Sequence, residues 1–226
     1  MIATAAFRAL IALAAAVGVV IECAYGSVPV ALSFFTIWTN ILVAAAFALS
    51  AARAWRGHPD VDPLWRGGVL LFILITGLVF HLVLDNASSP FNVVEDLNEL
   101  SGARAASNQL LHTVTPIGAL LDFLLLTAPR ALRPRHAARW LAFPALYLAF
   151  ALVRGALLSP GTKTRYTYPF LDVAQYGYPR VAVNGLVLGL AFYALGLALV
   201  TADHFRPTPP APRENRISSP ADGPLK

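Results

Sequence analysis

Long apolar runs separated by short polar segments form the pattern of the chain. Each run is near 20 residues long, the length at which a helix rising 1.5 Å per residue crosses a hydrocarbon layer about 30 Å thick. The pattern therefore predicts an all-α, polytopic membrane protein built as a bundle of six transmembrane helices. The predicted helices cover approximately Phe7 to Tyr25, Val28 to Ala51, Gly67 to Leu84, Asn108 to Ala128, Ala137 to Leu158 and Val181 to Ala202.

Short connections between most of the runs predict one transmembrane domain over residues 1–206. The following residues, 207–226, are rich in proline and poor in apolar side chains, so we expect a disordered cytoplasmic tail. Two longer connections differ from the rest. In residues 86–107, "NVVEDLNEL" predicts a short interfacial helix, and in residues 159–180 the tyrosines and prolines predict an ordered interfacial cover.

Composition supports the membrane assignment. The 226 residues are 57% hydrophobic and 13% charged, whereas soluble proteins are roughly 25% charged. The single cysteine excludes an internal disulfide and a cysteine metal cluster. Arg8 precedes the first run as in a secretory signal, but the run is longer than a usual signal core, so we expect an uncleaved first span.

The distribution of charge distinguishes a membrane protein from a nucleic-acid-binding protein. The net charge is +5, yet the basic residues gather in every second connection and in the tail. By the positive-inside rule we expect both termini to be cytoplasmic. We also expect the cell (plasma or inner) membrane as the location, and lipid rather than nucleic acid as the partner. These basic residues are Arg53, Arg56, Arg66, Arg130, Arg133, Arg135, Arg139, Arg206, Arg213, Arg216 and Lys226.

Polar residues inside the runs cluster near the non-cytoplasmic side under this topology. They share helix faces as well as depth, because residues three and four apart project in similar directions. A cluster supplied by several helices at one depth predicts a buried polar pocket. Its candidate residues are Thr36, Thr39 and Asn40 of the second run, His81 and Asp85 of the third, Asn108, His112 and Thr115 of the fourth, and Arg154 and Asn184.

Thr36 and His112 are the chemically competent pair within this cluster. A threonine hydroxyl becomes a nucleophile when a positioned base accepts its proton, and neutral imidazole is the usual base. Both residues are expected roughly 5 to 10 Å below the interface, counting 1.5 Å per residue. There an acyl chain could stay in hydrocarbon while its ester reached the hydroxyl, and Thr39, Asn40 or Asn108 could stabilise the oxyanion.

Structural interpretations of these residues stay open beside the catalytic one. The Thr36 hydroxyl could bond a carbonyl one turn back, and His112 could make a hydrogen bond between helices. Asp122 lies ten residues beyond His112, about 15 Å along a helix, so interhelical pairing is expected rather than a triad role.

The outlying candidates also have two interpretations each. His81 and Asp85 could orient the base or bind substrate, although Asp85 could equally be an interfacial residue in water. Arg154 could snorkel or bind a carboxylate.

Three segments carry a resemblance to a known family. "FFTIWTN" around Thr36, "LLHTVTP" around His112 and "YPFLDV" from Tyr168 to Val173 resemble the signatures of the androgen-induced gene and androgen-dependent TFPI-regulating protein family, in particular its bacterial members. The resemblance implies integral-membrane threonine hydrolases of fatty acid esters of hydroxy fatty acids. It places the catalytic roles on Thr36 and His112. A lid role for Tyr168 follows from the same resemblance, whereas composition alone makes it an aromatic-belt anchor.

The sequence therefore leaves four functions open. The first is an intramembrane lipid ester hydrolase, which calls for no metal or cofactor. The second is a transporter or channel, against which stand the missing repeat and the lack of broken helix pairs. The third is a membrane cytochrome with His81 and His112 as haem ligands. The fourth is a non-catalytic scaffold or a lipid- or small-molecule-binding protein using the same pocket.

Overall fold

The computed structural model describes residues 2–207 and consists of helices joined by short connections. Within these residues, six helical segments are long and apolar enough to cross a membrane, and three of them consist of two or three consecutive helices. The predicted all-α, six-span architecture is therefore confirmed, and the chain is a multi-pass protein embedded in a lipid bilayer. The predicted tail falls almost entirely on residues 208–226, which lie outside the described residues. The spans are Ile2–Tyr25, Phe35–Trp55, Pro63–Leu84, Gly102–Leu126, Pro134–Leu157 and Val173–Phe205.

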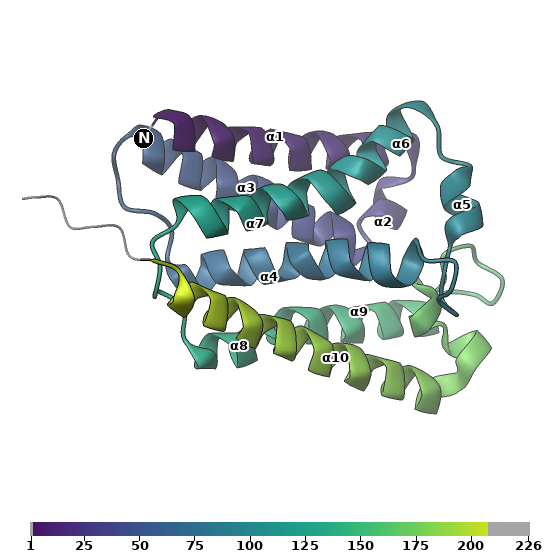
Figure 1. Ribbon diagram of the computed structural model, residues 1–226. Coiled ribbons are helices and arrows are strands. Elements are labelled where there is room, and N and C mark those ends of the chain that lie inside the picture. Colours follow the sequence, from purple (N-terminus) through teal and green to yellow (C-terminus); the bar gives the residue numbers. More distant parts are fainter. Residues whose placement is uncertain (1, 208–226) are drawn as a thin grey trace, which may run out of the picture.

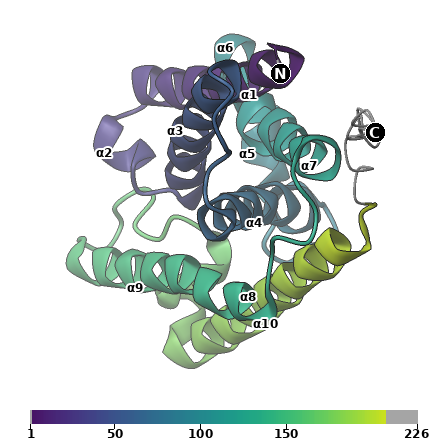
Figure 2. The same ribbon diagram turned by 90° about the vertical axis from the view of Figure 1, so that its left-hand side faces the viewer.

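The third span lies at the centre of the bundle, surrounded by the other helices (Figures 1 and 2). Its first part, α4, packs against α3, α7, α8 and α10, while α1 packs along α3, α6 and α7. The central span is 72% buried, against 17–44% for the other five. The helices are α1 (Ile2–Tyr25), α2 (Val28–Ala31), α3 (Phe35–Trp55), α4 (Pro63–Val79), α5 (Val94–Asn98), α6 (Gly102–Gln109), α7 (Thr115–Leu126), α8 (Pro134–Trp140), α9 (Ala142–Leu157) and α10 (Val173–Phe205).

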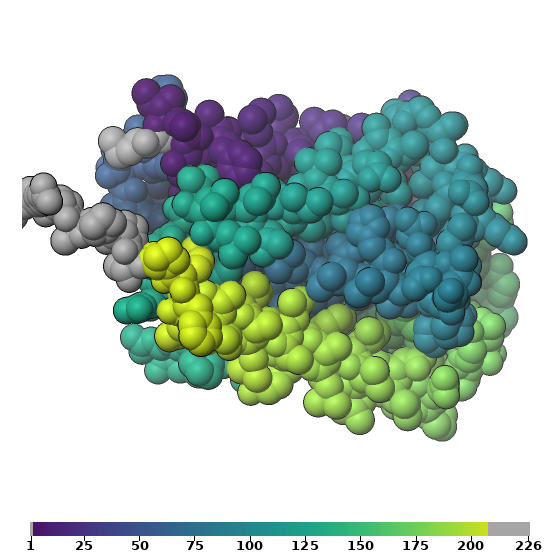
Figure 3. Space-filling model, in the orientation of Figure 1, coloured from purple at the N-terminus to yellow at the C-terminus, as the bar shows by residue number. Residues whose placement is uncertain are grey.

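The bundle has two distinct ends. Residues 2 and 207 lie at one end, called here the terminal end, together with α8 (Figure 1). The opposite end, called the loop end, carries α2, α5, α6 and the connection between α9 and α10 (Figure 1). On the face drawn in Figure 3, the loop-end part of the third span reaches the surface between α7 and α10, where Leu82 is 62% exposed.

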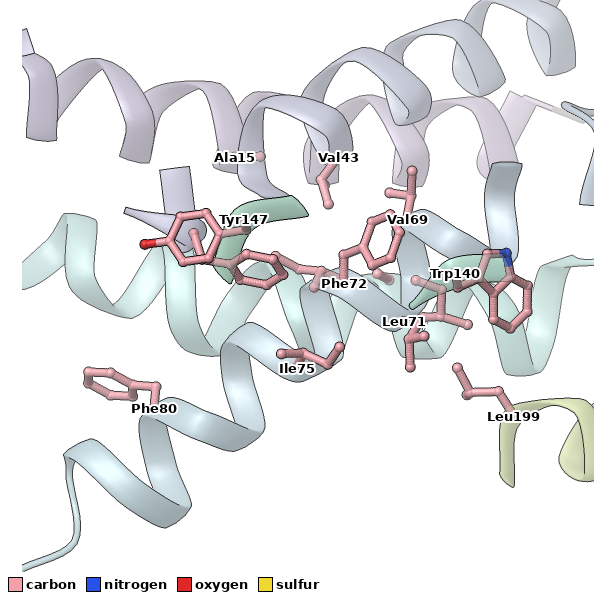
Figure 4. Packing of buried hydrophobic residues seen from close by; sticks show 14 of the residues in the cluster. Ala15, Val43, Val69, Leu71, Phe72, Ile75, Phe80, Trp140, Tyr147 and Leu199 are labelled. Atoms are coloured by element: carbon pink, nitrogen blue, oxygen red, sulfur yellow. The ribbon is translucent and has the colours of Figure 1, made fainter. Parts of the chain in front are cut away.

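The core forms where α4 meets α8 and α9. Figure 4 shows Leu71 and Phe72 of α4 among buried side chains that include Trp140 and Tyr147. A Cβ atom on Gly67 would lie 2.4 Å from the Trp140 ring, so only glycine lets the indole lie against the α4 backbone. The same indole donates a hydrogen bond to the Leu64 carbonyl at 2.8 Å, which leaves its N–H satisfied in the core.

The second predicted helix begins in the wrong place. Instead of one helix from residue 28, the short α2 ends at Ala31, and α3 begins at Phe35. Phe34 is extended between them, with φ −92° and ψ 136°. The break places Thr36 in the first turn of α3, where backbone N–H groups have no partner within the helix.

Two π-helical turns interrupt the third and fourth spans at the loop end: η1 (Phe80–Leu84) and η2 (Leu110–Val114). Pro116 follows η2 and has no N–H to offer the preceding turn. The Leu111 carbonyl instead accepts hydrogen bonds from Asn40 Nδ2 and Thr115 Oγ1, both at 3.2 Å. π-Turns often mark functional sites; here η1 contains Phe80 and η2 contains His112.

Charged side chains form a paired cluster at the terminal end. Asp122 is 1% exposed and lies 2.8 Å from the Arg8 Nε atom. Arg66 bridges Asp122 to Asp60, and Arg8 reaches Asp60 at 2.8 Å. Asp122 therefore pairs across helices, as its structural interpretation expected.

Candidate functional site

Thr36 and His112 meet at the loop end of the bundle. The Thr36 Oγ1 atom lies 3.2 Å from the His112 Nε2 atom. Thr36 comes from the first turn of α3 and His112 from η2, which follows α6 (Gly102–Gln109). The two helices thus bring a hydroxyl and an imidazole from 76 residues apart into hydrogen-bond distance.

The second nitrogen of His112 determines which proton the ring carries. Its Nδ1 atom lies 3.0 Å from the Asn108 carbonyl oxygen, and a carbonyl can only accept a hydrogen bond. Nδ1 therefore carries the proton, and Nε2 is left as the acceptor for the Thr36 hydroxyl. The Phe80 ring stacks on the imidazole at 4.1 Å between centroids, with 19° between planes, and holds its orientation.

Tyr168 is the third group at the pair. Its hydroxyl lies 3.4 Å from Thr36 Oγ1 and also accepts a hydrogen bond from the Thr36 N–H at 3.4 Å. Tyr168 is 9% exposed, so the aromatic-belt interpretation of this residue is wrong. Burial raises the pKa of its hydroxyl above the ordinary value. The phenol consequently stays protonated and remains a hydrogen-bond donor at neutral pH.

Two cavities meet at this group. The inner cavity, of about 240 Å³, is bounded by α4, α9 and α10. The outer cavity, of about 600 Å³, faces the loop end and includes Glu22, Arg104 and Asn108 in its wall. The catalytic candidates thus lie between a cavity without charged residues in its wall and one that has them. The residues common to both walls are Thr36, Phe80, Leu84, His112 and Tyr168.

Thr39, Asn40 and Thr115, which were predicted to line the pocket, instead make structural hydrogen bonds between helices. Thr39 Oγ1 lies 3.0 Å from the Thr36 carbonyl and 2.8 Å from Thr76 Oγ1. Asn40 donates to the Thr36 carbonyl at 2.9 Å and accepts from Thr115 Oγ1 at 2.8 Å. All three are fully buried, so the predicted oxyanion role of Thr39 and Asn40 is wrong. Asn108 lines the outer cavity.

His81 and Asp85 lie outside the pair. Both are exposed, and His81 Nε2 lies 3.1 Å from Thr113 Oγ1. His81 lines neither of the two cavities, whereas His112 lines both. The two imidazoles therefore share no pocket in which both could ligate one haem iron.

Arg154 and Asn184 hold the connection that carries Tyr168. Arg154 Nη1 donates to the Thr164 carbonyl at 2.8 Å, and Asn184 Nδ2 donates to the Phe170 carbonyl at 2.9 Å. Both side chains thus act on the backbone around the 3-10 turn η3 (Pro169–Leu171). This contact differs from both predicted roles of Arg154, snorkelling and carboxylate binding.

Phe80 and Tyr147 were missing from the predicted site. Tyr147 donates to the Ser33 carbonyl at 2.9 Å and lies at the same distance from Thr167 Oγ1, so it joins the break before α3 to the Tyr168 connection. Both are aromatic residues within apolar runs, where periodicity gives them no separate signal. Among residues 2–207, no group of three or more histidine, cysteine or acidic side chains is placed to hold a metal ion.

No family model, curated protein or solved structure matches the chain. The resemblance carried by the three short motifs therefore stays a prediction.

Proposed function

We propose that the protein is an intramembrane lipid ester hydrolase that cleaves fatty-acyl esters, with Thr36 as nucleophile and His112 as general base. The observation that carries the proposal is the 3.2 Å contact between Thr36 Oγ1 and His112 Nε2. The Asn108 carbonyl supports it, because it holds the imidazole in the tautomer that accepts a proton at Nε2.

In the acylation half, His112 Nε2 takes the Thr36 hydroxyl proton while Oγ1 attacks the ester carbonyl carbon. The carbonyl oxygen becomes an oxyanion that accepts hydrogen bonds from the Tyr168 hydroxyl and the Thr36 N–H. When the intermediate collapses, the leaving alcohol takes the proton from His112 Nε2. The acyl group stays on Thr36 as an ester.

In the deacylation half, a water molecule from the outer cavity attacks the acyl-threonine. His112 Nε2 takes one proton from this water and then returns it to Thr36 Oγ1 as the free fatty acid leaves. The outer cavity, with charged residues in its wall, supplies the water and receives the alcohol. No charged side chain among the described residues lines the inner cavity, so it stays apolar during both halves of the reaction.

The topology proposed with this function places both termini in the cytoplasm and the loop end on the other side of the cell membrane. The ester bond would then be cleaved near the non-cytoplasmic interface. The likeness of the three motifs to hydrolases of fatty acid esters of hydroxy fatty acids supports the same class of substrate.

Labelling of the detergent-purified protein with a fluorophosphonate, followed by peptide mass mapping, tests the nucleophile. We expect the adduct on Thr36 in the wild type and no adduct in Thr36→Ala or His112→Ala. Thr39→Ala is the matched threonine control: its hydroxyl lines neither cavity, so labelling should persist.

Equal labelling in the wild type and Thr36→Ala would overturn the assignment, as would a folded wild type that takes no label. The non-catalytic lipid-binding interpretation would then take its place, since the same two cavities serve it. A transporter that used the passage between the cavities would show solute flux in proteoliposomes that survives Thr36→Ala.

A further inference from the structure

The inner cavity has an apolar wall on three sides. Ile75 of α4, Leu148 of α9 and Leu188 of α10 belong to it. Among the described residues that line it, none is Asp, Glu, Lys or Arg. Three of its polar members, Thr36, His112 and Tyr168, lie where it meets the outer cavity. A ligand that fills it therefore presents hydrocarbon to nearly all of the wall and one polar group to the Thr36 hydroxyl.

The cavity is closed toward α4 and open toward the bilayer. Ile75 and Phe80 are 2% and 3% exposed, whereas Ala145 of α9 is exposed and Gly185 and Gly189 of α10 are half-buried. Figure 2 shows α9 and α10 on the side of the central helix away from α1. The opening thus lies between α9 and α10, where a membrane protein meets lipid chains.

Two glycines of α10 shape this opening. A Cβ atom on Gly185 would lie 3.2 Å from Leu148 Cδ2, so the two helices are close there. One turn further along, a Cβ atom on Gly189 would meet nothing within 4 Å. Glycine in a helix interior costs about 1 kcal/mol relative to alanine, and at Gly189 no packing contact explains that cost. The missing side chain keeps the gap open.

The volume limits what the cavity holds. A cavity of about 150 Å³ accommodates a benzene molecule, so the inner cavity, at about 240 Å³, has room for roughly ten carbons of a chain. A longer chain has to leave the cavity, and the gap at Gly189 opens to hydrocarbon.

We infer that the inner cavity binds the acyl chain of the ester, and that Gly189 leaves the gap between α9 and α10 through which the far end of a long chain extends into the bilayer. The inference rests on the proposed function and deepens it, because it makes long-chain esters the substrate class and Gly189 the residue that admits them.

Photo-crosslinking tests the site without requiring turnover. A palmitic acid analogue with a mid-chain diazirine is added to the detergent-purified protein, and the modified peptides are mapped. We expect adducts on cavity-lining residues of α9 and α10, with at least a roughly five-fold loss in Gly189→Leu, whose side chain fills the gap. The matched control is Leu190→Phe, which enlarges a residue that is 60% exposed and outside the cavity and should keep wild-type labelling.

Adducts confined to the outward-facing residues Leu186, Val187 and Leu190, or equal labelling in Gly189→Leu and the wild type, would overturn the inference. If Gly189→Leu does not fold, Gly189→Val takes its place: its Cβ has open space and its two methyl groups extend into the gap, so a smaller loss of labelling is expected, and no loss counts against the site.

Turnover separates this inference from the proposed function. For the wild type we expect hydrolysis of both p-nitrophenyl butyrate and p-nitrophenyl palmitate. Gly189→Leu should lower palmitate turnover about ten-fold relative to butyrate, because only the long chain needs the gap. Labelling of the cavity with no ester turnover would reject the hydrolase alone. Turnover with equal loss for both esters would reject the role of Gly189 alone.

Discussion

Two buried polar centres lie at opposite ends of the bundle, and their partners differ. At the terminal end, Asp122 contacts Arg8 and Arg66, so its charge is compensated by two guanidinium groups. At the loop end, the Thr36 hydroxyl has an imidazole and a phenol as its side-chain neighbours, and it faces two cavities.

The difference separates two uses of polarity inside a membrane protein. Buried charges that are paired with one another join helices, whereas a hydroxyl beside a base and a cavity can react with a ligand. The contacts around each polar side chain, rather than its depth, distinguish the two.

His112→Gln should have the largest effect on turnover at the loop end. Glutamine can still hydrogen-bond to Thr36 but cannot serve as a base, so we expect kcat for ester hydrolysis to fall about 10³-fold. The free energy of unfolding should change by less than about 1 kcal/mol, as for the loss of one ordinary hydrogen bond. Steady-state kinetics and denaturant unfolding in detergent measure the two quantities. Wild-type kcat in this variant would contradict the assigned base.

Asp122→Ala should produce the opposite pattern. Removing the carboxylate leaves Asp60 alone to compensate both Arg8 and Arg66, and the loss of one partner of a buried pair costs about 3–5 kcal/mol. Unfolding by titration with sodium dodecyl sulfate measures this loss, with Asp122→Asn as the control of similar size. Turnover per folded molecule should stay within roughly two-fold, because Asp122 is outside both cavities at Thr36. A selective loss of turnover would assign Asp122 to the site.

Tyr168→Phe tests the role of the phenol hydroxyl at the loop end. It removes one oxyanion donor and keeps the aromatic ring, so kcat should fall about 10²-fold with KM unchanged. The pKa of the Tyr168 hydroxyl is raised by burial, so the wild type should keep this donor as the pH rises to the ordinary tyrosine value of about 10. A rise in KM without a change in kcat would instead indicate a role in substrate binding.

Thr113→Ala should have the smallest effect. Thr113 is next to His112, but its hydroxyl contacts His81 and Gln109 on the exposed side of η2. We expect a change in unfolding free energy within about 0.5 kcal/mol, and wild-type ester turnover. A marked loss of turnover would show that the polar group around His81 supports the reaction.

The six spans were predictable because apolar length alone identifies a membrane helix. The contact between Thr36 and His112 was predictable in outline, since depth and helix face placed both near one interface. The break before α3 was not, because Leu32 and Phe34 continue the apolar run in which it occurs. The π-turns η1 and η2 were missed for the same reason: an extra residue in a turn leaves an all-apolar pattern unchanged.

The partners of charged residues were also beyond the sequence. Arg8 resembled the basic start of a signal segment, and Arg66 counted as a loop charge, yet both contact Asp122 inside the bundle. Tyr168 was assigned to the pocket through its motif, but its contact with Thr36 depends on how Arg154 and Asn184 hold the connection around it. Such contacts join residues far apart in the chain, and local patterns carry no information on them.

The pairing of Arg8 with Asp122 has a consequence for how the protein is made. The two residues are 114 positions apart, so the first helix leaves the ribosome long before Asp122 is synthesised. An unpaired arginine at the centre of a membrane helix costs about 2.5–3.5 kcal/mol during insertion. Arg8 is close to the start of its helix, where its side chain can reach lipid headgroups until the fourth span arrives. The pair with Asp122 therefore closes only after the fourth span is made, whereas Asp60, which Arg8 also contacts, is synthesised before the third span.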